Sequence, residues 1–463
     1  MEREKLKSRM GFILLSAGCA IGIGNVWKFP YMCGQYGGGA FVLIYILFLV
    51  ILGIPVMTME FSVGRASQKS PVKAYNELEK PGQKWHIHGY LAMIGNYLLM
   101  MFYTTVGGWM LHFFYLTAAG KFQGASTAEV EGAFTEMLGQ PWVMAGWMVL
   151  VVVLGFLINS VGLQNGLERI TKVMMVALLV IMVVLAVRSI TLSGGSEGLA
   201  FYLIPNLNTI KEVGLGNVIV GAMNQAFFTL SLGIGAMAIF GSYIGKERTL
   251  MGEAVNVSIL DTFVAFTSGL IIFPACFSFG VEPNSGPPLI FITLPNIFNE
   301  MAGGRLWGSL FFVFMAFAAF STILAVFENI MACCRDLWGW SRKKAAAINM
   351  VAITILSLPC VLGYNVWSGF HPFGDPSKQV LDLEDFLVSN IWLPLGSLIY
   401  LLFCVSKKGW GWKNFRKEAN TGKGLKMPGG KAIQFYLTWI LPIMILFIFA
   451  YGVYDVVLKN LLA

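Results

Sequence analysis

Two short glycine-containing runs hold the residue types best suited to binding chemistry. Residues 17–25 read Ala-Gly-Cys-Ala-Ile-Gly-Ile-Gly-Asn, and residues 228–235 read Phe-Thr-Leu-Ser-Leu-Gly-Ile-Gly. Both runs lie in long apolar stretches, where a glycine pair lets a helix unwind and frees backbone N–H and C=O groups. Freed N–H groups can hold an anion and freed carbonyls a cation. Glycines also serve close helix packing, but the amide and hydroxyl neighbours of both pairs favour binding.

Asp261 is a further candidate, because it stands in the middle of the apolar stretch from Val255 to Phe279. An ionisable side chain in such a stretch is costly unless it is paired, so it marks a functional site by default. The alternative is an embedded acid that merely takes up a proton.

These residues belong to a chain built mainly of apolar stretches. Of its 463 residues, 57% are hydrophobic and 12% are charged, which is too apolar for a soluble domain. A bilayer-spanning helix needs about 20 apolar residues. Eleven stretches qualify: 11–31, 41–61, 89–118, 142–159, 166–187, 216–243, 255–279, 306–334, 345–362, 386–404 and 432–457. The prediction is an all-α integral membrane protein with eleven transmembrane helices.

The charge pattern predicts the orientation of the chain. The formal charge is +8, and most of the 32 Lys and Arg residues gather in alternate loops. This is the pattern of the positive-inside rule rather than of a nucleic-acid-binding surface. The rule places the N-terminus in the cytoplasm, and an odd helix count leaves the C-terminus outside. The expected location is the plasma membrane, which is the inner membrane of a bacterium, with several passes.

The apolar stretches form two halves, each of which opens with its own glycine-broken segment. This arrangement is typical of an inverted-topology repeat, here of five plus five helices. The expected organisation is a cytoplasmic tail (1–10), a first five-helix repeat (11–190), an extracellular loop (191–215), a second repeat (216–404) with an extracellular hairpin (281–305), a cytoplasmic loop (405–431), and an eleventh helix with an extracellular C-terminus (432–463).

Several motifs resemble those of the neurotransmitter:sodium symporter family, which has the LeuT-type fold. They are Ala-Ile-Gly-Ile-Gly-Asn-Val-Trp-Lys-Phe-Pro (20–30), Gly-Gly-Gly-Ala-Phe (37–41), Phe-Tyr-Thr-Thr-Val-Gly-Gly-Trp (102–109), Gln-Ala-Phe-Phe-Thr-Leu-Ser-Leu-Gly (225–233) and Asp-Phe-Leu-Val-Ser-Asn (385–390). The resemblance runs from the tail to the tenth segment. It implies that segments one and six are unwound in mid-membrane, and the short loops look like those of a bacterial amino-acid transporter.

The resemblance implies two sodium sites. The first would use the Ala20 carbonyl, Asn25, Thr229 and Asp261. The second would use carbonyls of Gly18, Ile21 and Ala318 with the hydroxyls of Ser321 and Thr322. A hard monovalent cation does prefer several oxygens. Hydroxyls on membrane helices usually bond their own backbone, so the matching positions carry this assignment.

Asp261 departs from the Asn that is commonest in the family at this position. A carboxylate beside the first sodium supplies the fixed negative charge that animal members obtain from bound chloride. We therefore expect transport without chloride. A protonatable Asp261 could also export a proton on the return step.

The same resemblance implies an amino-acid substrate, because Gly22 replaces the acid found in carriers of amines that lack a carboxylate. The expected contacts are Gly24 and Tyr103 on the substrate carboxylate, with Ala20, Phe228 and Ser231 around its amine. The expected side-chain pocket consists of Leu99, Phe228, Ile234, Thr322 and Val326. Since that pocket lacks charged groups, it predicts a neutral aliphatic or aromatic amino acid.

Two gates are implied by the resemblance. Lys28 and Asp385 match the outer gate, where Lys stands in place of the usual Arg and loses its planar two-pronged geometry. The expected inner gate consists of Arg3, Tyr243, Glu328 and Asp336. In segment five, Val176 replaces a proline that bacterial relatives often carry after Gly166, so unwinding there is expected to cost more.

The sequence thus predicts a sodium-coupled symporter that imports neutral hydrophobic L-amino acids by alternating access, and not an enzyme. Its partners would be sodium, the amino acid and the bilayer, with no nucleic acid and no obligate protein partner. The four histidines lie near segment ends without ligand spacing, which disfavours a membrane-embedded enzyme. The alternative is a receptor-like or channel-type relative that binds amino acids without coupled transport.

Overall fold

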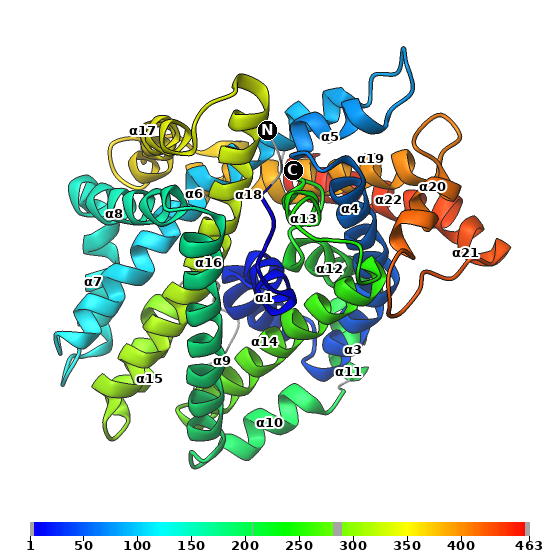
Figure 1. Ribbon diagram of the computed structural model, residues 1–463. Helices are drawn as coiled ribbons and strands as arrows, with labels where there is room; N and C mark the ends of the chain where they lie inside the picture. The colour runs from blue at the N-terminus through cyan, green and yellow to red at the C-terminus, as the bar shows by residue number, and fades with distance from the viewer. Residues whose placement is uncertain (1–3, 206, 281–288, 459–463) are drawn as a thin grey trace.

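The computed structural model of the chain describes residues 4–205, 207–280 and 289–458, and their backbone is helical almost throughout (Figure 1). Within these ranges the β-pairing consists of isolated bridges, Gly38 with Pro205 and Arg248 with Lys423. The all-α part of the prediction is therefore confirmed. Arg3, part of the predicted hairpin at 281–305 and the last residues lie outside the described ranges.

The helices follow one another with short connections. In the first half they are α1 (Arg9–Ala20), η1 (Gly24–Lys28), α2 (Phe29–Gln35), α3 (Gly39–Phe48), η2 (Leu49–Gly53), α4 (Ile54–Ser67), α5 (Pro71–Leu78), α6 (His86–Ala118), α7 (Thr127–Gly139), α8 (Pro141–Ser160), η3 (Leu163–Glu168), α9 (Arg169–Ile190), α10 (Gly195–Leu203) and α11 (Leu207–Val213).

The second half continues in the same way. Its helices are α12 (Leu215–Thr229), α13 (Ala236–Gly241), α14 (Leu250–Ser278), η4 (Leu289–Thr293), α15 (Leu294–Glu300), α16 (Gly304–Trp338), α17 (Arg342–Gly363), η5 (Pro372–Gly374), α18 (Val380–Phe386), η6 (Leu387–Trp392), α19 (Leu393–Val405), α20 (Trp412–Ala419), α21 (Lys431–Phe435), η7 (Tyr436–Ile440), α22 (Leu441–Val453) and η8 (Tyr454–Leu458).

Nine helices of the described residues are long and apolar enough to cross a membrane. The helices Arg9–Ala20 and Gly24–Gln35 meet at a bend of 57°. Counted together as one broken span, they raise the number of candidate spans to ten. The predicted sixth segment is divided into α12 and α13 by residues 230–235. The number eleven stays a prediction, because it depends on counting both broken segments as spans.

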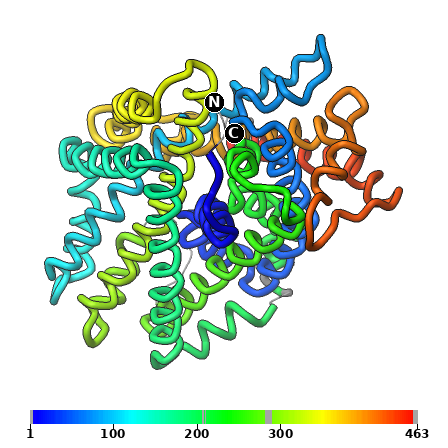
Figure 2. The backbone as a smooth tube through the Cα atoms, in the orientation of Figure 1, coloured from blue at the N-terminus to red at the C-terminus, as the bar shows by residue number. Residues whose placement is uncertain are grey.

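The broken segments lie at the centre of the molecule. Helix α1 is surrounded by other helices in both views of the backbone (Figures 1 and 2) and packs against α9, α14 and α16. Its residues from Gly11 to Ala20 are all buried. Polar backbone groups at the breaks therefore face protein, where side chains can satisfy them.

Prolines mark most of the places where a helix widens into a π-helical turn. The turns η1, η2, η4, η6 and η7 each end two residues before a proline: Pro30, Pro55, Pro295, Pro394 and Pro442. A proline lacks the N–H that continues the α-helical pattern and its ring crowds the carbonyl four residues earlier. A wider turn just before it relieves that conflict.

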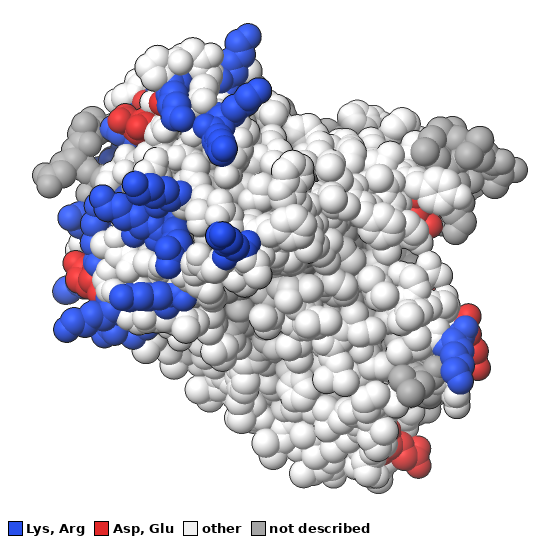
Figure 3. All heavy atoms as spheres, turned by 90° about the vertical axis from the view of Figure 1, so that its right-hand side faces the viewer, with Lys and Arg blue, Asp and Glu red and all other residues white. Residues whose placement is uncertain are grey.

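The outer surface has a wide uncharged zone. Figure 3 shows Lys and Arg gathered at one end of the visible face, with few charged residues over the rest. Helix α9 exposes Val173, Val176, Val180 and Val187, which share one face of the helix. Large exposed apolar side chains in such an arrangement indicate contact with lipid.

Candidate functional site

The first break begins where α1 ends at Ala20. Ile21 adopts an extended conformation (φ −69°, ψ 103°), and the chain becomes helical again at Gly24. The Gly22 N–H donates to Asn25 Oδ1 at 3.0 Å, and the Gly24 carbonyl accepts from Gln225 Nε2 at 3.2 Å. A side-chain amide thus replaces a helical partner at Gly22, while at Gly24 the Gln225 amide adds to the hydrogen bond from the Phe29 N–H.

The second break relies on positive backbone angles. Ser231, Gly233 and Gly235 have φ values of 50°, 99° and 73°. A glycine adopts such angles without steric cost, whereas the same conformation is strained in Ser231. At Gly233 a Cβ would also overlap the Leu393 carbonyl of α19. This position therefore requires glycine for conformation and for space.

The predicted ligands of the first sodium site converge from three elements. Asn25 Nδ2 lies 2.8 Å from Asp261 Oδ1, 3.0 Å from Thr229 Oγ1 and 3.2 Å from the Asp261 carbonyl. The Thr229 hydroxyl donates to Asp261 Oδ2 at 3.0 Å. All three residues are buried, and Ala20 lines the adjoining cavity.

This group of atoms has the chemistry of a cation site. Three oxygens, one of them from a carboxylate, surround a single point that the Asn25 NH₂ group occupies. An NH₂ group has two hydrogens, so it cannot satisfy three acceptors fully. A small hard cation is matched better by such an oxygen set.

The residues predicted for the second sodium site also lie together, between α1 and α16. The Ser321 hydroxyl contacts the carbonyls of Ile21 at 3.2 Å and Ala318 at 2.9 Å. The Thr322 hydroxyl lies 3.4 Å from the Gly18 carbonyl and 3.3 Å from that of Ile21. Three main-chain carbonyls and two hydroxyls thus face one another in a buried space.

A small cavity of about 20 Å³ separates the two breaks. It is lined by Ala20, Gly22, Gly24, Leu99, Tyr103, Phe228, Ser231, Ile234, Thr322, Val388 and Leu393. The predicted substrate residue Val326 is buried in α16 but does not line the cavity. This volume holds about one water molecule, so an amino acid can enter only if the walls move apart.

Two glycines bring the main chain to the cavity wall. A Cβ at Gly22 would overlap the Tyr103 hydroxyl and lie 2.7 Å from Thr322 Oγ1. A Cβ at Gly24 would lie 2.5 Å from Cε1 of Phe228. The Tyr103 hydroxyl accepts from the Ile23 N–H at 2.9 Å. The wall therefore presents backbone N–H groups beside a phenol.

The predicted outer-gate residues form a loose pair. Lys28 Nζ lies 3.9 Å from Asp385 Oδ2, and both side chains are about one-third exposed. The same ammonium lies 3.9 Å from the centre of the Phe228 ring, which is a cation–π distance. Asp385 also accepts from the Ser389 hydroxyl at 2.6 Å. A cavity of about 300 Å³ is lined by both residues, and one of about 450 Å³ is lined by Lys28.

The predicted inner-gate residues make different contacts. Glu328 accepts from the Tyr243 hydroxyl at 2.7 Å and forms a partly buried ion pair with Arg342. Asp336 accepts from the Ser70 N–H at 2.7 Å. Arg3, expected opposite Asp336, lies outside the described residues. Arg342 was not anticipated, since nothing in the sequence distinguishes it from the neighbouring Lys343 and Lys344.

Segment five is continuous beyond its first turn. Gly166 lies in the π-helical turn η3, where a Cβ would overlap the Ile158 carbonyl, and α9 runs from Arg169 to Ile190 through Val176. The continuity of helix α9 is compatible with the absence of a proline from its middle. Glu168 accepts from the Lys7 N–H at 2.9 Å and the Ser8 hydroxyl at 3.0 Å, which ties the tail to this turn.

Sequence reasoning missed other residues near the site. Glu60 of α4 is buried, and one of its oxygens accepts from the Gly233 N–H at 2.5 Å. Glu60, like Asp261, is an acid within an apolar stretch, so its position in the sequence could have identified it. Val388 and Leu393 carried no such signal, because they are apolar residues in an apolar helix.

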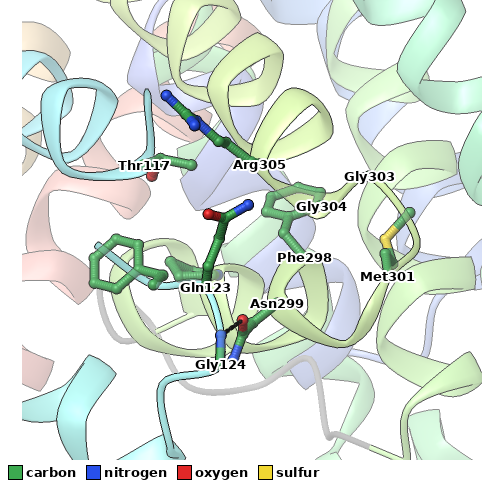
Figure 4. Close-up of a pocket in the computed structure, with 11 residues that line it drawn as sticks. Thr117, Gln123, Gly124, Phe298, Asn299, Met301, Gly303, Gly304 and Arg305 are labelled. Carbon is green, nitrogen blue, oxygen red and sulfur yellow. Dashed lines mark hydrogen bonds between the residues drawn. The ribbon is translucent and has the colours of Figure 1, made fainter. Parts of the chain in front are cut away.

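A separate cavity of about 260 Å³ lies between the end of α6 and the start of α16 (Figure 4). Asn299 Oδ1 accepts there from the Gly124 N–H at 3.0 Å, and Arg305 Nε donates to the Ala118 carbonyl at 2.8 Å. None of the predicted sodium or substrate residues lines it. Its polar groups mainly tie loops to helix ends, so we place the functional site at the breaks.

Comparisons with known proteins show which proteins this chain is similar to. The sequence profile of the sodium:neurotransmitter symporter family matches residues 3–128 and 133–459. An uncharacterized sodium-dependent transporter of Bacillus subtilis, YhdH, is 35% identical over 96% of this chain and 96% of its own length. One from Haemophilus influenzae is 29% identical over 97% and 98%. The solved structure of MhsT with L-phenylalanine matches at a TM-score of 0.86 and 36% identity, covering 97% of this chain and 100% of MhsT.

Proposed function

The chain belongs to the sodium:neurotransmitter symporter family, and from that premise we propose that it imports neutral, hydrophobic L-amino acids together with sodium. As a member of this family it is a multi-pass membrane transporter and not an enzyme. The observation that carries the proposal is the cavity between the two breaks, with an oxygen cluster on each side of it. The amino-acid substrate is supported by the likeness to MhsT, whose solved complex holds L-phenylalanine.

The proposed binding mode gives each end of an amino acid a partner. The carboxylate would meet the N–H groups near Gly22 and Gly24 and the Tyr103 hydroxyl, since a helix start attracts negative charge. The amine would meet main-chain carbonyls at Ala20 and Phe228. The side chain would meet Leu99, Ile234 and the other apolar residues of the cavity lining. A charged side chain would lose water there without a partner.

Asn25 provides a physical route for coupling sodium to the amino acid. Its Oδ1 accepts the Gly22 N–H, while its Nδ2 faces the oxygens of Thr229 and Asp261. A cation in the oxygen cluster attracts Oδ1 and repels Nδ2, so the amide turns and releases the Gly22 N–H. The released N–H then becomes available to the substrate carboxylate. Each ligand thereby raises the affinity of the other, as linkage requires.

Thermal stabilisation of the purified protein by amino acids tests this proposal. A ligand that binds the folded state raises the apparent stability, by about 2.7 kcal/mol at a concentration of 100 Kd. We expect neutral aliphatic or aromatic amino acids to raise Tm in sodium and not in potassium, and lysine or glutamate to have no effect. Equal shifts in both salts, or shifts with charged amino acids alone, would refute the proposal.

Transport is expected to be independent of chloride. The Asp261 carboxylate is buried within hydrogen-bonding distance of Asn25 and Thr229, where it supplies a fixed negative charge beside the first proposed sodium site. A second anion there would be repelled. Uptake at fixed sodium should stay constant when gluconate replaces chloride. A rise of uptake with chloride concentration would contradict this assignment.

The plasma membrane, with the N-terminus in the cytoplasm, is the proposed setting. Its support is the gathering of Lys and Arg at one end of the visible surface in Figure 3. The receptor-like or channel-type alternative would bind amino acids without accumulating them, so uptake into vesicles along a sodium gradient separates these functions.

A further inference from the structure

The break between α12 and α13 leaves main-chain groups that other helices satisfy from two sides. The Gly233 N–H donates to Glu60 of α4 at 2.5 Å. The next residue, Ile234, directs its carbonyl the other way, toward Asn96 of α6 and Asn329 of α16. A buried carbonyl without a partner is costly, so these two asparagines help determine where Ile234 lies.

The two asparagines form a connected amide pair. Asn96 Nδ2 donates to the Ile234 carbonyl at 2.8 Å and to the Ala92 carbonyl of its own helix at 2.7 Å. Its Oδ1 accepts from Asn329 Nδ2 at 3.0 Å, and that nitrogen also lies 3.4 Å from the Ile234 carbonyl. Asn96 is 1% and Asn329 0% exposed. The donors and the acceptor of Asn96 are all used, which fixes its orientation.

The amide pair lies beside the apolar part of the proposed substrate cavity. Leu99, which lines the cavity, follows Asn96 by one helical turn on the same face of α6. The Ile234 side chain also lines the cavity, and its Cγ2 would lie 2.9 Å from a Cβ at Gly95. Helices α6 and α16 pack against each other along their length. The pair therefore ties Ile234 to α6 and α16, the helices that contribute Leu99 and Thr322 to the cavity lining.

We propose that Asn96 and Asn329 are positioning residues that set the room available to the substrate side chain. They hold the Ile234 carbonyl at a fixed distance from Leu99 and thereby decide which size of amino acid fits. Neither asparagine needs to touch the substrate. This inference rests on the proposed function, since it concerns the specificity of the same cavity.

The test compares two amino acids of different size in parent and variants. Apparent Kd values of valine and phenylalanine are measured by thermal shift in saturating sodium. Asn96→Ala removes two donors to the wall, so the ratio of the two Kd values should change by at least about tenfold in favour of phenylalanine. Asn329→Ala should change the ratio in the same direction, and it keeps the test open if the first variant does not fold.

Asn349→Ala is the matched control. Asn349 of α17 is 1% exposed, donates to the Ala345 carbonyl at 2.8 Å and bonds the Tyr97 hydroxyl, but it makes no contact with Ile234. This variant should lose stability without a change in the ratio. If the Asn96 and Asn329 variants weaken both amino acids by equal factors, the asparagines are merely structural and the inference is overturned. If the parent binds neither amino acid, the proposed function itself fails first.

Discussion

Asp261→Ala should abolish sodium-dependent amino-acid binding and uptake. The carboxylate supplies the only formal charge among the residues proposed for the first sodium site, and it accepts hydrogen bonds from Asn25 at 2.8 Å and Thr229 at 3.0 Å. Without it a desolvated cation has no counter-charge. We expect uptake to fall by at least about 100-fold, which is the lower end of the effect of losing two hydrogen bonds to a charged group. Initial rates in vesicles with an inward sodium gradient measure this.

Ser268→Ala on the same helix is the control for that variant. Ser268 is fully buried in α14, and among the described residues its hydroxyl bonds only its own helix, at the Val264 carbonyl 2.8 Å away. Its replacement should leave uptake within about twofold of the parent. Retention of sodium-dependent uptake by the Asp261 variant would rule out its role as a sodium ligand.

Gly22→Ala should prevent substrate binding although it adds a single methyl group. A Cβ at this position would overlap the Tyr103 hydroxyl and lie 2.7 Å from Thr322 Oγ1. Both contacted atoms lie on the cavity wall, so the methyl group displaces the groups that would receive the carboxylate. We expect the amino-acid-induced rise in Tm to disappear at ligand concentrations of 100 times the parent Kd, which is a loss of about 2.7 kcal/mol.

A glycine-to-alanine substitution in the second broken segment controls for the general effect of introducing alanine. Gly216, near the start of α12, has open space around a Cβ. Its replacement by alanine should preserve ligand binding and stabilise the helix slightly. If Gly22→Ala binds amino acids as well as Gly216→Ala does, the cavity between the breaks is not the substrate site.

The central features of the site were predictable from local sequence. The glycine pairs at Gly22 and Gly233 mark the two breaks. Few other residues tolerate the backbone angles, or the close contacts between main chain and neighbouring groups, that these positions require. Asp261 was recognisable because a carboxylate is rare in an apolar stretch. The family resemblance drawn from these motifs is confirmed by the profile match over most of the chain. The sodium and substrate assignments stay predictions until binding is measured.

Other contacts could not be predicted, because they depend on packing between distant helices. Glu328 pairs with Arg342 across the turn between α16 and α17, yet Lys343 and Lys344 were equally plausible partners by charge. Val388 and Leu393 line the cavity, although their apolar side chains resemble those of any lipid-facing position. Burial of these residues follows from the whole fold and not from their neighbours in sequence.

The fold was predicted at the level of segments and not of helix shape. A count of apolar stretches cannot show that five π-helical turns precede Pro30, Pro55, Pro295, Pro394 and Pro442. The physical cause is local, since each proline removes one backbone donor. The rule is not general, because Pro274 in α14 and Pro359 in α17 lie within continuous α-helix.

Uptake of a neutral amino acid into vesicles that contain the purified protein tests the central claim most directly. The claim is that unwound main chain between two broken helices binds sodium and an amino acid together, so that one gradient drives the other. With sodium outside and potassium inside, the vesicles should accumulate leucine or phenylalanine above the external concentration, and collapsing the sodium gradient should release it. Binding in sodium without accumulation, or equal uptake when potassium replaces sodium, would contradict the account.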